Sequence, residues 1–220
     1  MRMSEPAEDI PFPMRARGAL RSLGCDGRRG VALTLVCAAL IALAAGGTAA
    51  RQALRYDRHA LAAGEWWRLA TAHLVHLSFE HAALNALALA LLWALFARDY
   101  SPRAWLLIVA GSAAAIDLGL WIVDSTVIWY VGSSGVLHGV FAAGAATRLR
   151  RGERDGWVLA ALLVAKLAYE QSAGALPLVA GPIVVDAHLY GALGGLAASL
   201  AAQVACRARA AHPVPSTRQL

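Results

Sequence analysis

Six long apolar segments, separated by charged islands, constrain the fold of this chain more than any other feature. They cover residues 31–50, 80–97, 103–123, 134–149, 156–169 and 181–206. A helix needs about 20 largely apolar residues to cross the roughly 30 Å hydrocarbon core of a bilayer. Charged residues make up only 15% of the chain, against about 25% in a soluble domain. The sequence therefore predicts an all-α membrane protein, built as a bundle of six transmembrane helices.

The predicted bundle occupies residues 31–206, between a polar N-terminal tail (residues 1–30) and a C-terminal tail (residues 207–220). The fourth segment is short: at 1.5 Å per residue it gives a helix only about 24 Å long. Its N-terminal end, at Ser134, is therefore expected to lie below the membrane surface.

The arginines are divided unequally between the two sides that six spans would create. Fifteen lie in the tails and in the links at 97–103 and 148–154, whereas four lie on the other side: Arg51, Arg55, Arg58 and Arg68. Segments rich in Lys and Arg stay in the cytoplasm. Both tails are therefore expected to be cytoplasmic, and an odd number of spans would break this asymmetry.

The net charge of +6 does not indicate a nucleic-acid-binding protein. The basic residues stand at the ends of apolar segments and form no stripe with interleaved aromatic residues, so nucleic acid is excluded as a partner and the lipid bilayer is expected. The three cysteines, Cys25, Cys37 and Cys206, have no metal-like spacing and are interpreted as unpaired thiols.

Polar residues inside membrane segments are costly and are candidates for function. At the start of the second segment, His81 and Asn85 are four residues apart and share one helical face, with His76 just before them. Hydrogen bonding between helices, worth about 0.6 kcal/mol on average, is the structural alternative for this group.

The fourth segment opens with a serine flanked by glycines, Gly132, Ser134 and Gly135. At a helix N-terminus such a serine has an accessible hydroxyl and a neighbouring backbone N–H that is free to bind an oxyanion. Small residues also serve helix packing in membranes, so it is the position of this serine at the helix start, and not the glycine–serine sequence alone, that indicates a catalytic role. His138 follows one turn later and faces the same way. Ser134 is the candidate nucleophile.

The sixth segment presents a histidine beside a face of glycines. Gly191 and Gly195 have the spacing that lets another helix approach closely, and His188 lies one turn before them. If this face packs on the fourth helix, His188 can act as the base that activates Ser134. Asp186 lies on a different helical face, so we expect a Ser–His dyad.

Three other charged residues lie within predicted spans. Lys166 and Glu170 are spaced i, i+4 and are expected to pair, while Asp117 stands alone in the third segment. We interpret all three as structural, with substrate gating as the alternative. In the first external loop, Trp67 and Arg68 follow Trp66, and either an interfacial aromatic belt or a loop packed on the bundle would explain them.

Taken together, these motifs resemble the rhomboid intramembrane serine proteases. The matching residues are Trp67 and Arg68 in the loop, His76, His81 and Asn85 in the second segment, Gly132, Ser134 and Gly135 in the fourth, and His188, Gly191 and Gly195 in the sixth. The resemblance covers residues 31–206 and implies a six-helix rhomboid fold. It also implies that the Ser134 backbone N–H, His81 and Asn85 form the oxyanion site, with no metal or organic cofactor.

One position departs from that family pattern. Many rhomboids carry a tyrosine one turn after the serine, stacked on the catalytic histidine, whereas this chain has His138. An imidazole could replace part of that stacking role.

A finer resemblance concerns the rhombosortase subgroup. Residues 64–69 (Gly-Glu-Trp-Trp-Arg-Leu) and 134–139 (Ser-Gly-Val-Leu-His-Gly) are similar to it, as is the compact length. This implies a bacterial inner-membrane enzyme, open to the periplasmic side, whose substrates are exported proteins with a C-terminal Gly-Gly-containing sorting helix. A general rhomboid protease acting on single-span proteins, a non-catalytic rhomboid-like chaperone and a small transporter subunit are the alternatives.

Overall fold

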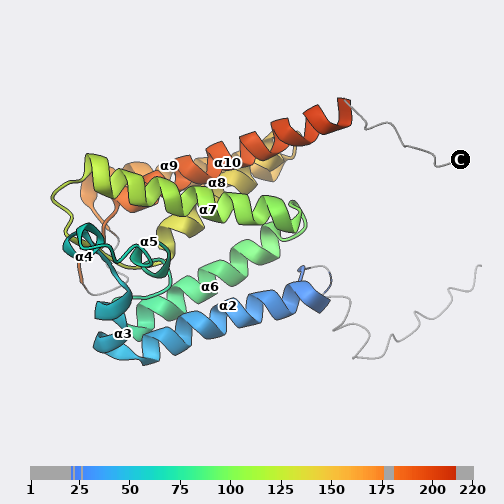
Figure 1. Ribbon diagram of the computed structural model, residues 1–220. Coiled ribbons are helices and arrows are strands. Elements are labelled where there is room, and N and C mark those ends of the chain that lie inside the picture. Colours follow the sequence, from blue (N-terminus) through green and yellow to red (C-terminus); the bar gives the residue numbers. More distant parts are fainter. Residues whose placement is uncertain (1–20, 22, 26, 176–180, 212–220) are drawn as a thin grey trace, which may run out of the picture.

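The computed structural model describes residues 21, 23–25, 27–175 and 181–211, with side chains up to residue 205. In this part of the chain the regular structure is mostly helical, as predicted. The long helices lie side by side (Figure 1). They are α2 (Gly27–Ala45), α6 (Phe79–Phe96), α7 (Pro102–Leu118), α8 (Ser134–Arg150), α9 (Arg154–Ala173) and α10 (Asp186–Ala211).

The helices differ from the predicted segments mainly at the two ends of the chain. The first predicted segment ends at residue 50, but α2 stops at Ala45 and the chain bends at Gly46 and Gly47 before α3 (Gly47–Leu54). Gly47 has a φ of +61°, a conformation that favours glycine. The sixth predicted segment starts at residue 181, whereas α10 starts at Asp186 and continues to Ala211. Most of the tail at residues 1–30, and residues 212–220 of the other tail, lie outside the described residues.

Among the described helices, three are long and apolar enough to cross a membrane. They are Gly27–Ala45, Phe79–Phe96 and Pro102–Val123, and the last of these joins α7 to the π-helical turn η1 (Gly119–Val123). The helix α8 is different because most of its residues from Gly135 to Ala145 are buried by neighbouring helices. Six membrane spans therefore remain a prediction, although a helix occupies each of the predicted segments.

Serine residues set the starts of two of the long helices. The Ser78 hydroxyl accepts a hydrogen bond from the His81 backbone N–H at the start of α6, and the Ser101 hydroxyl does the same for Ala104 in α7. Such caps satisfy backbone donors that a helix N-terminus leaves free. Pro102 at the first position of α7 is compatible with the helix because that N–H needs no helical partner.

Short elements gather at one end of the bundle and close it (Figure 1). They are α3, α4 (Arg58–Ala62), α5 (Arg68–Thr71), and the strands β1 (Tyr56–Asp57) and β2 (Trp129–Tyr130). The strands pair antiparallel, with Tyr56 opposite Tyr130, which ties the first loop to the segment before α8. Tyr56 is fully buried in a core that also contains Ile116 and Ala187. The loop is thus packed on the bundle.

Candidate active site

Ser134 is the first residue of α8, and the turn before it is held on both sides. Gly132 has a φ of +123°, which only glycine adopts without strain. Its backbone N–H donates to the Ala72 carbonyl at 3.0 Å, and its carbonyl accepts from the Tyr130 hydroxyl at 2.7 Å. The glycine at this position is therefore needed to direct the chain into α8 with the serine at the helix start.

The hydroxyl of Ser134 lies within hydrogen-bonding distance of His188. The distance from Ser134 Oγ to His188 Nε2 is 2.8 Å, which is within the range for a nucleophile and its base. His188 sits in the first turn of α10 and is almost completely buried. The structure thus brings together the serine and the histidine that the sequence singled out, across 54 residues of chain.

Close packing of glycines on α8 and α10 makes this contact possible. A Cβ added to Gly191 would collide with the backbone of Gly135, and one added to Gly195 would collide with the backbone of Gly139. A Cβ on Gly135 would lie 2.6 Å from the Ala187 carbonyl oxygen. Because no side chains separate the helices here, the backbones approach closely. Gly191 and Gly195 therefore pack α10 on α8, the arrangement on which the predicted Ser134–His188 contact depended.

The other ring nitrogen of His188 contacts an acidic residue of α9. Nδ1 of His188 lies 2.9 Å from Oε2 of Glu170, and both side chains are buried. The Glu170 carboxylate also pairs with Lys166, one turn earlier. The Lys166–Glu170 pair was expected, but the contact with His188 was not. Asp117, expected to be structural, lies 3.4 Å from the ring of His73.

A signal for the role of Glu170 was present in the sequence. Glu170 follows directly after the fifth apolar segment, at the end where the arginine distribution also places Ser134 and His188. Which way its side chain turns is decided by how α9 packs, because a pattern within one helix does not reveal the rotation of that helix about its axis.

His138 occupies the position where many rhomboids have tyrosine, and its ring stacks on His188. The ring centroids are 4.3 Å apart and the planes are inclined by 15°. Nδ1 of His138 lies 2.7 Å from the carbonyl oxygen of Ser134, so this nitrogen donates the hydrogen bond. His138 thus packs on the base and also holds the first turn of α8.

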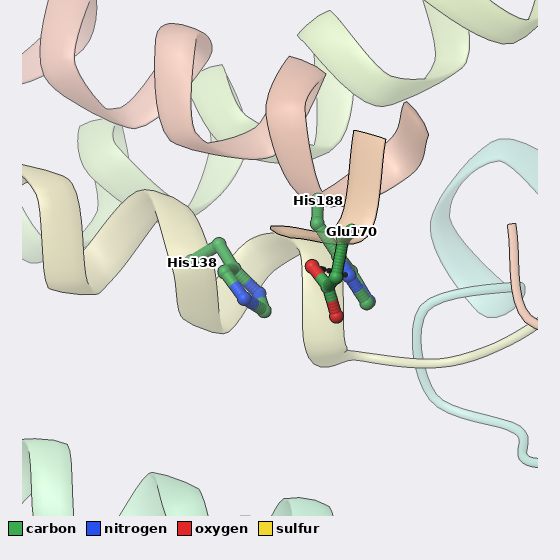
Figure 2. A group of neighbouring side chains, drawn as sticks. All are labelled: His138, Glu170 and His188. Atoms are coloured by element: carbon green, nitrogen blue, oxygen red, sulfur yellow. Dashed lines mark hydrogen bonds and ion pairs between the residues drawn. The ribbon is translucent and has the colours of Figure 1, made fainter. Parts of the chain in front are cut away.

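Figure 2 shows His138, Glu170 and His188 converging from α8, α9 and α10. Their ligand-type atoms lie within 4.8 Å of one another, a separation that a metal site would also have. The two imidazole rings, however, are nearly parallel, so their in-plane lone pairs do not point to a common centre. Both nitrogens of His188 are also engaged, by Ser134 and Glu170. The geometry fits a hydrogen-bonded chain better than a metal centre.

His81 lies beside the serine turn from the α6 side. A Cβ on Gly132 would lie 3.5 Å from His81 Nε2 and 3.8 Å from Ser134 Oγ, so the ring and the hydroxyl border the same space. The Leu77 backbone N–H points to Nδ1 of His81 at 3.4 Å, which leaves the proton of a neutral ring on Nε2. That N–H is available for a hydrogen bond to an oxyanion.

Asn85 and His76 both contact His81. The amide nitrogen of Asn85 donates to the His81 backbone carbonyl at 3.2 Å, so this hydrogen bond holds the first turn of α6. His76 lies edge-on to the ring of His81, with centroids 5.0 Å apart, and its Nε2 is 3.3 Å from the hydroxyl of Ser133. A direct oxyanion role for Asn85 remains a prediction.

Trp67 and Arg68 lie in the packed loop. The Arg68 guanidinium is buried, pairs with Glu65 at 2.6 Å and donates to the carbonyls of Gln52 and Arg55 at 2.9 and 3.0 Å. Arg68 therefore holds the loop together. The Trp67 side chain is 54% exposed, as an interfacial tryptophan would be. The loop thus combines both interpretations, since its arginine is buried and its tryptophan is exposed.

Comparison with known proteins identifies the family. A model of the rhomboid domain matches residues 63–203, which is more than half of the chain and includes Ser134, Glu170 and His188. The chain belongs to the rhomboid family. A Bacillus subtilis (strain 168) protein named "Putative rhomboid protease YdcA" is 30% identical over 135 residues, covering 61% of this chain and 66% of that protein. No solved structure matches this rhomboid chain.

Family membership and the apolar helices together make this rhomboid protein an integral membrane protein. The aligned region covers just under two thirds of the Bacillus relative.

Proposed function

We propose that this rhomboid protein is an intramembrane serine endopeptidase, with Ser134 as the nucleophile and His188 as the base. The observation that carries the proposal is the 2.8 Å separation of Ser134 Oγ and His188 Nε2 at the adjoining starts of α8 and α10. Family membership supports the reaction class. The glycine packing that holds the pair supports it further, because a transporter subunit would not require this geometry.

The chemistry follows from these positions. Ser134 Oγ attacks the carbonyl carbon of the scissile peptide bond while Nε2 of His188 takes the hydroxyl proton, and the carbonyl electron pair moves to the oxygen. When the tetrahedral intermediate collapses, the same proton passes to the leaving amine. Water then attacks the acyl-enzyme, again with His188 as base, and releases the new carboxylate and Ser134.

The oxyanion that forms needs donors at the start of α8. One proposed donor is the Nε2–H of His81, because its ring borders the space beside Ser134 Oγ. The other is the backbone N–H of Ser134, which as the first residue of α8 has no partner within the helix. Loss of one such donor costs about 2.7–4 kcal/mol in other enzymes. Asn85 is assigned to this site through its hydrogen bond to the His81 backbone.

The site is proposed to open on the side of the membrane opposite the termini. The arginine-rich links lie at the far end of α8 and α7 from Ser134, which supports cytoplasmic termini and an external or periplasmic active site. A cavity of about 300 Å³ lies between residues 126–131 and the segment with Pro182 and Val184. These segments lead into α8 and α10, so the cavity is a candidate entry for an unwound substrate segment.

The proposed substrates are membrane-anchored proteins with a C-terminal transmembrane or sorting helix, in the bacterial inner membrane. The similarity of residues 64–69 and 134–139 to rhombosortases favours helices that follow a Gly-Gly motif. The second candidate is a general rhomboid protease that cuts single-span proteins, and the same active site supports it.

The activity test uses the protein reconstituted in vesicles with a labelled single-span substrate. We expect Ser134→Ala and His188→Ala each to abolish cleavage, whereas Ser133→Ala remains active because its hydroxyl faces His76. Full activity in Ser134→Ala would refute the proposed nucleophile, and an inactive wild type against all substrates would favour a non-catalytic rhomboid.

A paired substrate test separates the two candidate specificities. One substrate carries a Gly-Gly motif, an apolar helix and an arginine-rich tail, and the other is an unrelated single-span protein. Preference for the first supports the rhombosortase assignment. Cleavage of the second alone contradicts that assignment and leaves the general protease.

A further inference from the structure

The buried acid of α9 is the feature that a serine–histidine pair does not require. Glu170 is 3% exposed and lies at 2.9 Å from Nδ1 of His188. Burying a carboxylate is costly by several kcal/mol unless it is paired and hydrogen-bonded. An ion pair with Lys166 would be enough for a purely structural acid. The contact of the other carboxylate oxygen, Oε2, with His188 therefore indicates a further role.

We propose that Glu170 is a positioning residue of the active site, acting on the substrate only through His188. This inference rests on the proposed protease function and extends the pair to a chain of three side chains, Ser134, His188 and Glu170. The elements α8, α10 and α9 contribute one member each, and Figure 2 shows the Glu170 and His188 side chains meeting from α9 and α10.

Lys166 keeps the carboxylate of Glu170 in the form that this role needs. The ammonium pairs with Oε1 of Glu170, while Oε2 faces His188. Next to a cation the carboxyl group is ionised, and an ionised carboxylate only accepts hydrogen bonds. The pair expected from the i, i+4 spacing therefore has a purpose within the site.

The ionised acid determines where the His188 proton resides. Because Glu170 can only accept, Nδ1 of His188 carries the proton and Nε2 presents its lone pair to Ser134 Oγ. In the opposite tautomer, Nε2 would carry a proton and could not take another from the serine. Glu170 thus selects the one neutral form of the ring that can act as a base.

The acid also stabilises the charge that forms during the reaction. When Nε2 takes the Ser134 proton, His188 becomes an imidazolium that keeps its Nδ1–H bonded to Glu170, and the carboxylate takes up no proton. Of the other groups around the ring, His138 stacks on one face, and it carries no negative charge that could assist. Glu170 is the acid that the described residues place against the base.

The test compares Glu170→Gln with Glu170→Asp and with Glu153→Gln. Glutamine has the same shape, but its amide can also donate to Nδ1 and so permits the wrong tautomer. By analogy with acids in other serine proteases, we expect kcat to fall by about 10²- to 10⁴-fold in Glu170→Gln. KM should stay within about threefold, because the buried carboxylate does not meet the substrate. Glu170→Asp should recover part of kcat, and Glu153→Gln, at the other end of α9, should keep full activity.

A charge-balanced variant guards against misfolding. Glu170→Gln leaves Lys166 without its acid, so the double variant Lys166→Met, Glu170→Gln removes the whole pair and should show the same loss of kcat with an unchanged melting temperature. Either variant, once folded, with kcat within about threefold of the wild type would overturn the proposal. A rise in KM alone, or an equal loss in Glu153→Gln, would do the same.

The two proposals fail in different ways. If Ser134→Ala is inactive and Glu170→Gln is fully active, the protease assignment stands and only the role of Glu170 is wrong. If Ser134→Ala cleaves normally, the proposed function itself is wrong. A fluorophosphonate that reacts with the activated serine gives a second readout, and it should label Glu170→Gln much more slowly than the wild type.

Discussion

Gly191→Ala should disable the enzyme without touching any side chain of the proposed active site. An added Cβ would lie 2.5 Å from the carbonyl carbon of Gly135, and the carbonyl oxygen is nearer still. An ordinary contact starts at 3.4 Å, so α10 must move away from α8 by at least about 0.9 Å to clear the carbon, and by more to clear the nearer oxygen.

His188 is three residues before Gly191 on the same helix and moves with it. A displacement of this size would lengthen the 2.8 Å separation of Ser134 Oγ and His188 Nε2 to about 3.7 Å or more, beyond hydrogen-bonding distance. A misplacement near 1 Å can reduce the rate by about 10²-fold. The free energy of unfolding should fall by about 1–3 kcal/mol, as for other overpacked interiors.

The assay measures kcat/KM on a labelled single-span substrate in vesicles, together with the rate of fluorophosphonate labelling at Ser134. Ala197→Val is the matched control, because it adds volume to an exposed position of α10 and should leave both rates unchanged. If folded Gly191→Ala keeps more than a third of wild-type activity, close glycine packing is not what holds the base. A loss of cleavage with normal labelling would place the defect in substrate binding instead.

Two further predictions concern the histidines around the site. His138→Phe keeps a ring on His188 but loses the hydrogen bond to the Ser134 carbonyl, whereas His138→Ala loses both. Since a stacked pair is worth about 0.5–1.5 kcal/mol, the kcat of His138→Ala should be up to about tenfold lower than that of His138→Phe. Equal kcat values in the two variants would contradict a role for stacking. Burial, together with the charge of His81, lowers the pKa of His76 to about 4. An unfolded histidine has a pKa near 6.5, so between pH 6.5 and 4 the unfolded state binds more protons at this residue than the folded state does. The contribution of His76 to the free energy of unfolding is therefore fully present above pH 6.5, and it falls by up to about 3 kcal/mol as the pH drops to 4. Melting temperatures across this range should depend less on pH in His76→Gln than in the wild type or in the exposed-site control His59→Gln, and an unchanged slope would refute this origin.

Much of the architecture could be read from local patterns. The apolar segments at 80–97, 103–123 and 134–149 predicted the starts of α6, α7 and α8 to within one residue. Helix starts are local because they depend on capping residues such as Ser78 and on glycines that permit a turn. Ser134 could be singled out for the same reason, since its flanking glycines and its helix start lie in one short stretch.

The partners of each residue across helices were harder to predict. The glycine spacing in α10 indicated a close approach to another helix, and the structure places that approach on α8 at Gly135 and Gly139. The sequence also singled out Asn85 for the oxyanion site; its amide nitrogen donates to the His81 backbone carbonyl one turn earlier, and its oxyanion role stays a prediction.

The sequence by itself determined a helical membrane protein with a serine at a glycine turn and a histidine beside a glycine face. Those properties follow from apolar length, helical period and local turn geometry, which act over a few residues. Only the tertiary structure decided that Glu170 contacts His188 and that His138 stacks on the same ring. Such contacts depend on the rotation of each helix about its axis, and that rotation is set by packing among all the helices together.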